Sequence, residues 1–153
     1  MGAKRAEHSA EIEAARERCF QALLEYETFP DWQRAVKGVE VLSRDDEGRG
    51  RDVEFQIDAK VRSVRYVLRY SYEPPGWIGW EYVEGDVKDV DGEFALDQAD
   101  DGVTLATYRL SLDAGVWLPG PIQRVLSDQV MKGAVEDLKR RVEGPYGRAA
   151  GDR

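Results

Sequence analysis

The chain has 153 residues, of which 42% are hydrophobic and 34% charged, and a formal net charge of −8. This length fits one domain with a core large enough to fold without disulfides or metal. The acidic balance excludes a surface that neutralises phosphates in bulk, and no apolar run approaches the roughly 20 residues of a membrane-spanning helix. We therefore expect neither a nucleic-acid partner nor stable membrane insertion.

The cysteine content and the N-terminal residues indicate a compartment. The single cysteine, Cys19, cannot form a disulfide within the chain, and no stretch near Met1 has the apolar core of a signal peptide. Structural disulfides belong to oxidising compartments, whereas cytosolic proteins keep their thiols reduced. The sequence therefore predicts a soluble protein of the reducing cytoplasm.

The first predicted elements are a strand and one or two short helices. Residues 7–14 predict a strand, because small and apolar residues alternate there with polar ones. Residues 16–24 predict a short helix, because apolar residues recur at helical spacing. Pro30 ends any helical run nearby, so we expect residues 29–32 to form a turn or a second short helix.

From Gly38 onward the hydrophobic period changes to two, the repeat of a strand with one buried face. Tyr66 and Tyr70, for example, alternate with Arg65 and Arg69. Turns rich in Gly, Pro and Asp separate the alternating segments. The predicted strands cover residues 39–43, 53–61, 64–72, 77–83, 88–96 and 103–112.

The last predicted element is one long amphipathic helix over residues 122–142. Gly133 lies in the middle of its apolar side, where glycine costs about 1 kcal/mol relative to alanine. We therefore expect Gly133 to mark the closest approach of this helix to the sheet or to a ligand. Residues 1–5 and 144–153 are polar and contain glycine, and we predict flexible tails on a single domain of residues 6–143.

Several short motifs follow one another along this α+β chain. They are residues 29–32 (FPDW), 39–41 (VEV), 66–70 (YVLRY), 91–96 (DGEFAL), 107–110 (TYRL), 118–120 (LPG) and 137–142 (DLKRRV). With the order of the predicted elements, these motifs resemble the START-like helix-grip superfamily (SRPBCC), in its polyketide cyclase/dehydrase branch.

The resemblance implies an α+β helix-grip fold. In that fold a curved antiparallel sheet of six to seven strands wraps a long C-terminal helix, and two short helices after the first strand close one end. It also implies a hydrophobic cavity between sheet and helix, which relatives use for lipids, sterols, quinones, plant hormones or polyketide intermediates. A fold with so many ligands does not identify the one bound here.

The sequence offers little for catalysis. The only histidine, His8, lies at the edge of the predicted N-terminal tail, and Cys19 lies on the apolar side of the first helix. Neither a nucleophile–base pair nor a His/Cys metal cluster is therefore expected. No glycine-rich phosphate-binding pattern is present. We assign no catalytic residue, no metal and no cofactor.

Aromatic residues gather on the inward face of the predicted strands, and two interpretations stay open: a plain core, or a ligand cavity. Tyrosine hydroxyls need partners in a dry core, and the resemblance adds weight to a cavity. The cavity residues are then Phe55, Ile57, Tyr66, Leu68, Tyr70, Trp80, Tyr82, Phe94, Tyr108, Leu110, Leu126, Val130 and Gly133, with Phe29 and Trp32 at the mouth.

A basic stripe alternates with the inward residues. Arg62, Arg65 and Arg69, with Arg51 nearby, fall on the outer face of the predicted sheet. We expect a solvated face on which these arginines pair with acidic residues of neighbouring strands. The candidate partners are Glu54, Asp58, Glu81 and Glu93.

The leading hypothesis is the binding or carriage of a small hydrophobic molecule: a lipid, an isoprenoid or a polyketide-like compound. The alternative is a polyketide aromatase/cyclase, for which Tyr66, Tyr70 and Tyr108 are inward but no inward carboxylate or histidine is predicted. A further alternative is a protein-interaction module with a filled core. A cavity above roughly 300 Å³ would favour ligand binding over the module.

Overall fold

The computed structural model describes residues 4–58, 63–113, 115, 121 and 133–143. In this part of the chain, short helices lie between the first two strands and a further helix follows the last strand. In chain order the elements are β1 (Lys4–Ile12), α1 (Arg16–Leu24), the 3-10 helix η1 (Tyr26–Thr28), α2 (Phe29–Trp32), β2 (Val36–Arg44), β3 (Gly50–Asp58), β4 (Ser63–Glu73), β5 (Trp77–Gly85), β6 (Asp89–Asp100), β7 (Val103–Asp113) and α4 (Gly133–Glu143).

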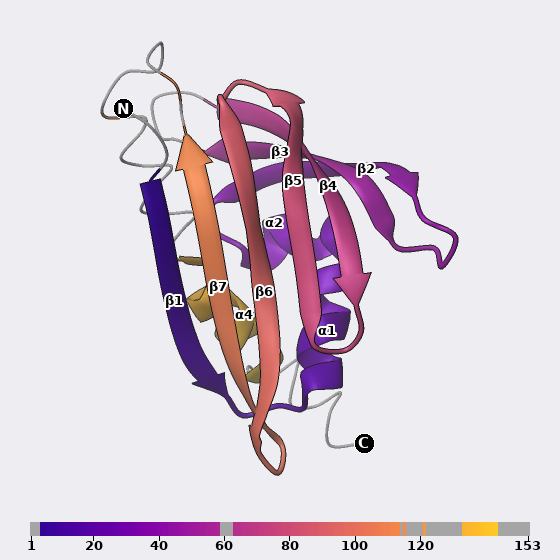
Figure 1. Cartoon of the computed structure of the whole chain (residues 1–153), viewed down its shortest axis with the longest axis vertical. Coiled ribbons are helices and arrows are strands. Elements are labelled where there is room, and N and C mark those ends of the chain that lie inside the picture. The colour runs from indigo at the N-terminus through magenta and orange to yellow at the C-terminus, as the bar shows by residue number, and fades with distance from the viewer. Residues whose placement is uncertain (1–3, 59–62, 114, 116–120, 122–132, 144–153) are drawn as a thin grey trace.

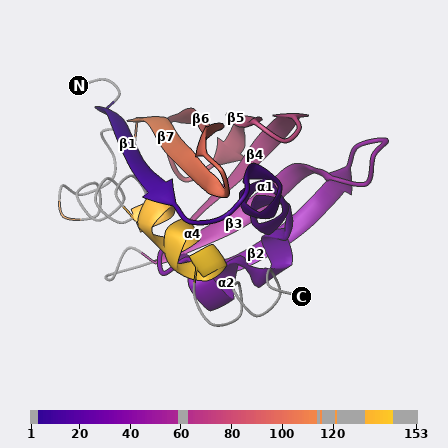
Figure 2. The same ribbon diagram turned by 90° about the horizontal axis from the view of Figure 1, so that it is seen from below.

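The strands form one antiparallel sheet in the order β1-β7-β6-β5-β4-β3-β2 (Figure 1). Consecutive strands are neighbours except at β1, which pairs with the last strand, β7. The helices between β1 and β2 carry the chain from one edge of the sheet to the other. The sheet bends around α1, α2 and α4, which all lie on its concave side (Figure 2). This is the predicted α+β helix-grip arrangement, including the two short helices after the first strand.

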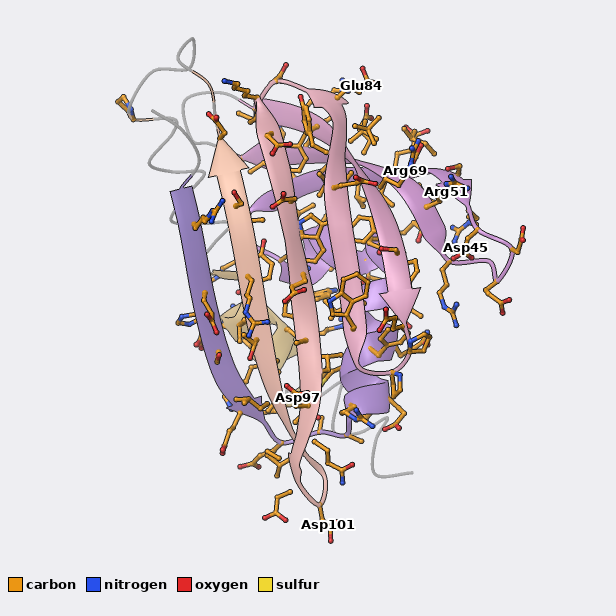
Figure 3. All side chains as sticks on the ribbon, in the orientation of Figure 1. Asp45, Arg51, Arg69, Glu84, Asp97 and Asp101 are labelled. Atoms are coloured by element: carbon orange, nitrogen blue, oxygen red, sulfur yellow. The ribbon has the colours of Figure 1, made fainter. Side chains whose placement is uncertain are left out.

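The strand register confirms which side chains face inward. Tyr66 pairs with Phe55, and both are buried against the helices, whereas Arg69 pairs with Asp52 on the convex face. A slip of one residue would have exchanged the two faces of β4 and buried its arginines. Figure 3 looks onto the convex face and shows charged side chains, Arg69 and Glu84 among them, turned away from the helices.

Several elements are longer than their apolar patterns predicted. β1 begins at Lys4, and β2 covers nine residues where five were predicted. Backbone pairing explains both, since Lys4 pairs with Leu112 and the ladder between β2 and β3 continues to Arg44. The predicted strand residues 59–61 and helix residues 122–132 lie outside the described residues.

The core lies between the concave face and the helices. α1 buries Cys19, Phe20 and Leu23 toward it, at the spacing that predicted this helix. α4 buries Val135, Leu138 and Val142, which recur every three to four residues on one side of the helix. The hydrophobic core therefore joins segments from both ends of the described chain.

A glycine makes room for the largest ring in this face. Gly92 on β6 pairs with Trp80 on β5. An added Cβ at Gly92 would lie 2.9 Å from the indole ring and 2.4 Å from the carbonyl oxygen of Arg109. Glycine at this position therefore lets Trp80 lie close to β6 and β7 in the concave face.

Candidate functional site

The concave face and the helices enclose a cavity of about 70 Å³. Most of its lining is aliphatic or aromatic. The described residues that line it are Leu23, Tyr26, Phe29, Gln33, Ala35, Val36, Phe55, Ile57, Tyr66, Leu68, Tyr70, Ile78, Trp80, Val90, Phe94, Tyr108, Leu110, Ala134 and Asp137. This volume holds a few water molecules and is below the roughly 300 Å³ expected of a site for a drug-sized ligand. The volume by itself therefore favours the filled core over the ligand cavity.

Aromatic rings form a continuous wall across five strands. The ring centre of Trp80 lies 5.7 Å from that of Tyr70 and 5.6 Å from that of Tyr108. Phe94 continues the wall at 5.0 Å from Tyr108, and Phe55 extends it toward β3 at 6.3 Å from Tyr70. Tilted aromatic pairs at such distances stabilise one another beyond the area that they bury. The wall therefore fixes the shape of this side of the cavity.

Three tyrosine hydroxyls in the wall have no hydrogen-bond partner in the part of the chain that the structure describes. They belong to Tyr66, Tyr70 and Tyr108. Yet no described side-chain nitrogen or oxygen that is sealed from solvent lacks a partner. The three hydroxyls are therefore not sealed, and they face the open space of the cavity.

These phenols are neutral hydrogen-bond donors. Burial raises the pKa of Tyr66 and of Tyr108 well above the ordinary value of 10. Burial also raises the pKa of Tyr70, with a further contribution from repulsion by the neighbouring phenols Tyr72, Tyr108 and Tyr66. The cavity therefore presents O–H groups rather than negative charge.

One carboxylate does face the cavity, against the expectation that no inward carboxylate is present. The side chain of Asp137 on α4 is only 4% exposed and lines the cavity. It accepts hydrogen bonds from the backbone N–H and the Nε of Arg34, both at 3.0 Å, and from Arg140. The helical spacing places Asp137 on the apolar side of its helix with Leu138, so the sequence carried a signal of its inward position. Its distant partner Arg34 is evident only in the folded chain.

The structure brings most of the predicted cavity residues to one place, although their part in ligand binding stays a prediction. Those that line the cavity are Phe29, Phe55, Ile57, Tyr66, Leu68, Tyr70, Trp80, Phe94, Tyr108 and Leu110. Leu126 and Val130 lie outside the described residues.

Three predicted residues are not part of the lining. The Tyr82 hydroxyl donates to the carbonyl oxygen of Val87 at 2.6 Å. Trp32 packs on the outer side of Phe29, with ring centres 5.2 Å apart. An added Cβ at Gly133 would meet no described atom nearer than the Asp137 carboxylate, at 3.8 Å. The described residues therefore give no support for a close approach at Gly133.

Some lining residues had no place in the sequence-based prediction. Ile78 is two residues from Trp80 on β5 and points to the same face, so the strand alternation was sufficient to predict its position. Gln33, Ala35 and Val36 follow α2, where no regular period exists, and only their tertiary position reveals them. Tyr26 is 1% exposed and follows the first helix without a periodic signal.

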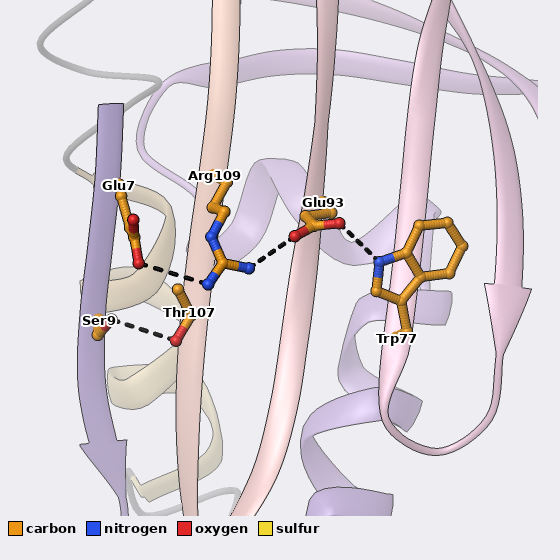
Figure 4. Close-up of polar contacts among 6 residues, drawn as sticks. All are labelled: Glu7, Ser9, Trp77, Glu93, Thr107 and Arg109. Carbon is orange, nitrogen blue, oxygen red and sulfur yellow. Dashed lines mark hydrogen bonds and ion pairs between the residues drawn. The ribbon is translucent and has the colours of Figure 1, made fainter. Parts of the chain in front are cut away.

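The convex face carries ion pairs between neighbouring strands, as predicted, although Arg69 pairs with Asp52, which was not among the candidate partners. Arg65 pairs with Glu54, and Arg109 with Glu93 at 2.6 Å. Figure 4 shows one row of contacts across four strands, in which Trp77 donates to Glu93 at 2.8 Å and Arg109 also reaches Glu7 at 3.4 Å. Within the basic stripe Arg65 and Arg69 are thus paired with acidic neighbours, whereas Arg51 forms no ion pair among the described residues and Arg62 lies outside them.

His8 and Cys19 lie away from the cavity lining. His8 is in β1 opposite Tyr108, and its Nε2 lies 3.5 Å from Glu136. Cys19 is fully buried, and this burial raises its pKa to about 11. Within the described residues no group of three or more His, Cys, Asp or Glu side chains is placed to hold a metal, and no helix is long and apolar enough to span a membrane.

The fold and the apolar cavity define a START-like helix-grip protein. The sequence profile of the family described as polyketide cyclase/dehydrase and lipid transport matches residues 3–143, and the chain belongs to this family. No curated protein matches the sequence.

Solved structures share the fold at low sequence identity. A START superfamily protein from Mycobacterium smegmatis is 21% identical, with a TM-score of 0.80 over 93% of this chain and 98% of that chain. The Zhui aromatase/cyclase from Streptomyces sp. R1128 is 16% identical, with a TM-score of 0.80 over 97% and 99%. A protein from Thermus thermophilus is 16% identical, with a TM-score of 0.75 over 90% and 96%. Identities this low establish a common fold only.

Proposed function

We propose that this protein binds a small hydrophobic molecule, of lipid, isoprenoid or polyketide-like character, in the cavity between the sheet and the helices. The observation that carries the proposal is the set of hydroxyls of Tyr66, Tyr70 and Tyr108, which face an apolar cavity without a partner among the described residues. An ordinary core would use phenylalanine here, because an unsatisfied buried hydroxyl costs about 1–3 kcal/mol. Phenols in a cavity can instead donate to the oxygen atoms of a ligand.

Ligand binding requires the cover of the cavity to move. About 70 Å³ is too small for a molecule of more than a few heavy atoms. The part of the cover nearest Phe55 consists of η1 and α2, which have only three and four residues. Displacement of these two short elements would open the cavity beside Phe55. We therefore keep Phe29 and Trp32 as the proposed mouth.

A polyketide aromatase/cyclase is the second candidate, and Asp137 is the observation in its favour. A carboxylate in the cavity wall is a potential acid or base beside phenol donors. However, Arg34 and Arg140 occupy both of its oxygens, and a general base needs a free oxygen directed at its substrate. Binding without chemistry therefore has the stronger support. We also propose, as the sequence predicts, that residues 6–143 form a single domain and that the protein is cytoplasmic.

The first test uses N-phenyl-1-naphthylamine, a neutral apolar dye whose fluorescence rises when it leaves water. We expect saturable one-to-one binding to the native protein. Ala134→Leu places added bulk at a residue that lines the cavity, so we expect roughly tenfold weaker dye binding, equivalent to about 1.4 kcal/mol. Native mass spectrometry of the freshly purified protein, with extraction of apolar compounds, then identifies any bound molecule.

Gly133→Ala is the matched control. It adds a methyl group to the neighbouring residue of the same helix, where the Cβ meets only ordinary contact distances. Dye affinity is expected to stay unchanged, while the helix gains propensity. Equal dye affinity for the native protein and Ala134→Leu, or the absence of saturable binding, would contradict the proposal and favour a filled core.

A further inference from the structure

At the edge of the cavity two arginines share one carboxylate, and a third arginine lies over the nearby Trp32 ring. Arg34 and Arg140 both donate to Asp137. Arg141 is the next residue on α4, and its guanidinium carbon lies 6.0 Å from the ring centre of Trp32. Arg141 has no carboxylate within ion-pair distance in the described part of the chain. We call Arg34, Arg140 and Arg141 the arginine cluster.

The arginine cluster differs from the arginines of the convex face. There Arg65 contacts two carboxylates, Glu54 and Glu84, and Arg69 binds both oxygens of Asp52. In the arginine cluster Arg34 and Arg140 share the Asp137 carboxylate, and Arg141 forms no ion pair among the described residues. An excess of positive charge at one point of a chain with a net charge of −8 indicates a local preference for an anion.

The cluster retains hydrogen-bonding capacity. A guanidinium has five N–H donors, and Arg34 and Arg140 each use one on the Asp137 carboxylate. Their side chains are 70% and 56% exposed, so the remaining donors are open to solvent. The exposed carboxylate of Asp31 on α2 forms no ion pair with them among the described residues.

The arginine cluster also borders the cavity. Asp137 lines the cavity, and its carboxylate contacts Arg34 and Arg140. Trp32, beneath Arg141, packs on the cavity residue Phe29. α2 and α4 lie side by side on the concave side of the sheet (Figure 2). Near Asp137, a single layer of side chains therefore separates the cavity from the exposed arginine cluster.

We propose that the ligand carries a carboxylate, which binds to the arginine cluster while its apolar body occupies the cavity. This inference rests on the proposed function, and it narrows the ligand to an apolar carboxylic acid. The planar fork of arginine matches a carboxylate through two parallel N–H donors, and such charge-assisted bonds are about twice as strong as neutral ones. Asp137 then orients Arg34 and Arg140 and neutralises one of the three positive charges, which leaves an excess of positive charge for the ligand carboxylate.

The test compares decanoate with decanol, two ligands that share an apolar chain and differ in charge. Each is titrated against protein loaded with N-phenyl-1-naphthylamine, and dye displacement gives its affinity. We expect decanoate to bind at least roughly tenfold more tightly than decanol at about 20 mM salt. The preference should shrink at about 500 mM salt, because partly exposed charges are screened.

Arg141→Gln is the decisive variant, because Arg141 supports no ion pair that folding needs. We expect its decanoate affinity to fall roughly fivefold to tenfold, with decanol and dye affinities unchanged. Arg34→Gln combined with Arg141→Gln should abolish the preference for decanoate. The matched control is Arg51→Gln, because Arg51 is an exposed arginine far from the arginine cluster. It lies near the start of β3, whereas Val36, which follows Arg34, pairs with Ile57 near the end of β3.

The outcomes separate the two proposals. Equal affinities of decanoate and decanol for the native protein, or equal losses in Arg141→Gln and Arg51→Gln, would overturn the carboxylate inference and leave ligand binding intact. Failure of the dye and of both decyl compounds to bind would overturn ligand binding itself, and the carboxylate inference with it. Circular dichroism and melting temperature confirm that each variant is folded.

Discussion

The hydroxyl oxygens of Tyr26 and Tyr72 lie 2.7 Å apart, and the Tyr72 hydroxyl in turn donates to the carbonyl oxygen of Gly50. Tyr26 must therefore be the donor to Tyr72. This chain of two hydrogen bonds joins η1 to β4 and β3. It differs from the cavity wall, where the Tyr108 hydroxyl has no partner in the described residues.

Loss of the Tyr72 hydroxyl is expected to destabilise the fold, and loss of the Tyr108 hydroxyl is not. Tyr72→Phe removes two hydrogen bonds and leaves the Tyr26 hydroxyl without an acceptor, so we expect the free energy of unfolding to fall by about 1–3 kcal/mol. Tyr108→Phe should change it by less than about 0.5 kcal/mol. Urea denaturation followed by tryptophan fluorescence measures both. Equal destabilisation by the two substitutions would mean that the Tyr108 hydroxyl has a structural partner.

Gly92→Ala is expected to disturb the cavity wall. The new methyl group would lie 2.4 Å from the carbonyl oxygen of Arg109 and 2.9 Å from the Trp80 ring, so β6 or the indole must shift. We expect a loss of about 1–3 kcal/mol in the free energy of unfolding, with a change in tryptophan emission. The control is Gly38→Ala on β2, whose Cβ would lie 3.7 Å from Gln56. Similar stability of the two variants would contradict the close packing of Trp80.

Removal of Asp137 tests the contact between α4 and Arg34, in the segment that follows α2. Asp137→Ala deletes the acceptor of three hydrogen bonds from Arg34 and Arg140. Both arginines are more than half exposed, so water can solvate them, and we expect a loss of about 1–3 kcal/mol rather than the roughly 3–5 of a fully buried pair. Glu136→Ala on the same helix loses only a 3.5 Å contact with His8 and should be near neutral. A neutral Asp137→Ala would mean that the carboxylate does not anchor the helix.

Glu93 is expected to contribute to acid sensitivity. Hydrogen bonds from Trp77 and Arg109 lower the pKa of Glu93 below its ordinary value of 4.5. The folded state therefore holds its proton less tightly than the unfolded state, and the resulting stability is present above pH 4.5 and lost as the pH falls through the folded-state pKa. Glu93→Gln should be less stable than the native protein at about pH 7, and the difference should shrink toward about pH 3.

Urea denaturation at several pH values across this range measures the dependence. Asp91→Asn is the control, because Asp91 is an exposed carboxylate on the same strand with no ion pair in the described residues. A stability difference between native protein and Glu93→Gln that stays constant across this range would show that the row of contacts in Figure 4 does not depend on the charge of Glu93.

The sequence alone determined which face of β4 carries the inward tyrosines. Successive side chains of a strand point to opposite faces, so the alternation of Tyr66 and Tyr70 with Arg65 and Arg69 already separated the concave from the convex face. The helical spacing of Leu138 and Val142 likewise predicted the buried side of the last helix. Local periodicity is sufficient to assign the buried face of a strand or helix, because that face is set by the repeat of side chains within the one element.

Tertiary structure decided the contents and size of the site. The burial of Asp137 depends on Arg34, which is 103 residues away in sequence and adjacent in space. Gln33 and Val36 line the cavity because the chain after α2 turns under the sheet, and no residue pattern marks that turn. The cavity volume depends on how side chains of the sheet and the helices interdigitate. Packing among distant segments is a property of the folded chain as a whole, and no local pattern in the sequence contains it.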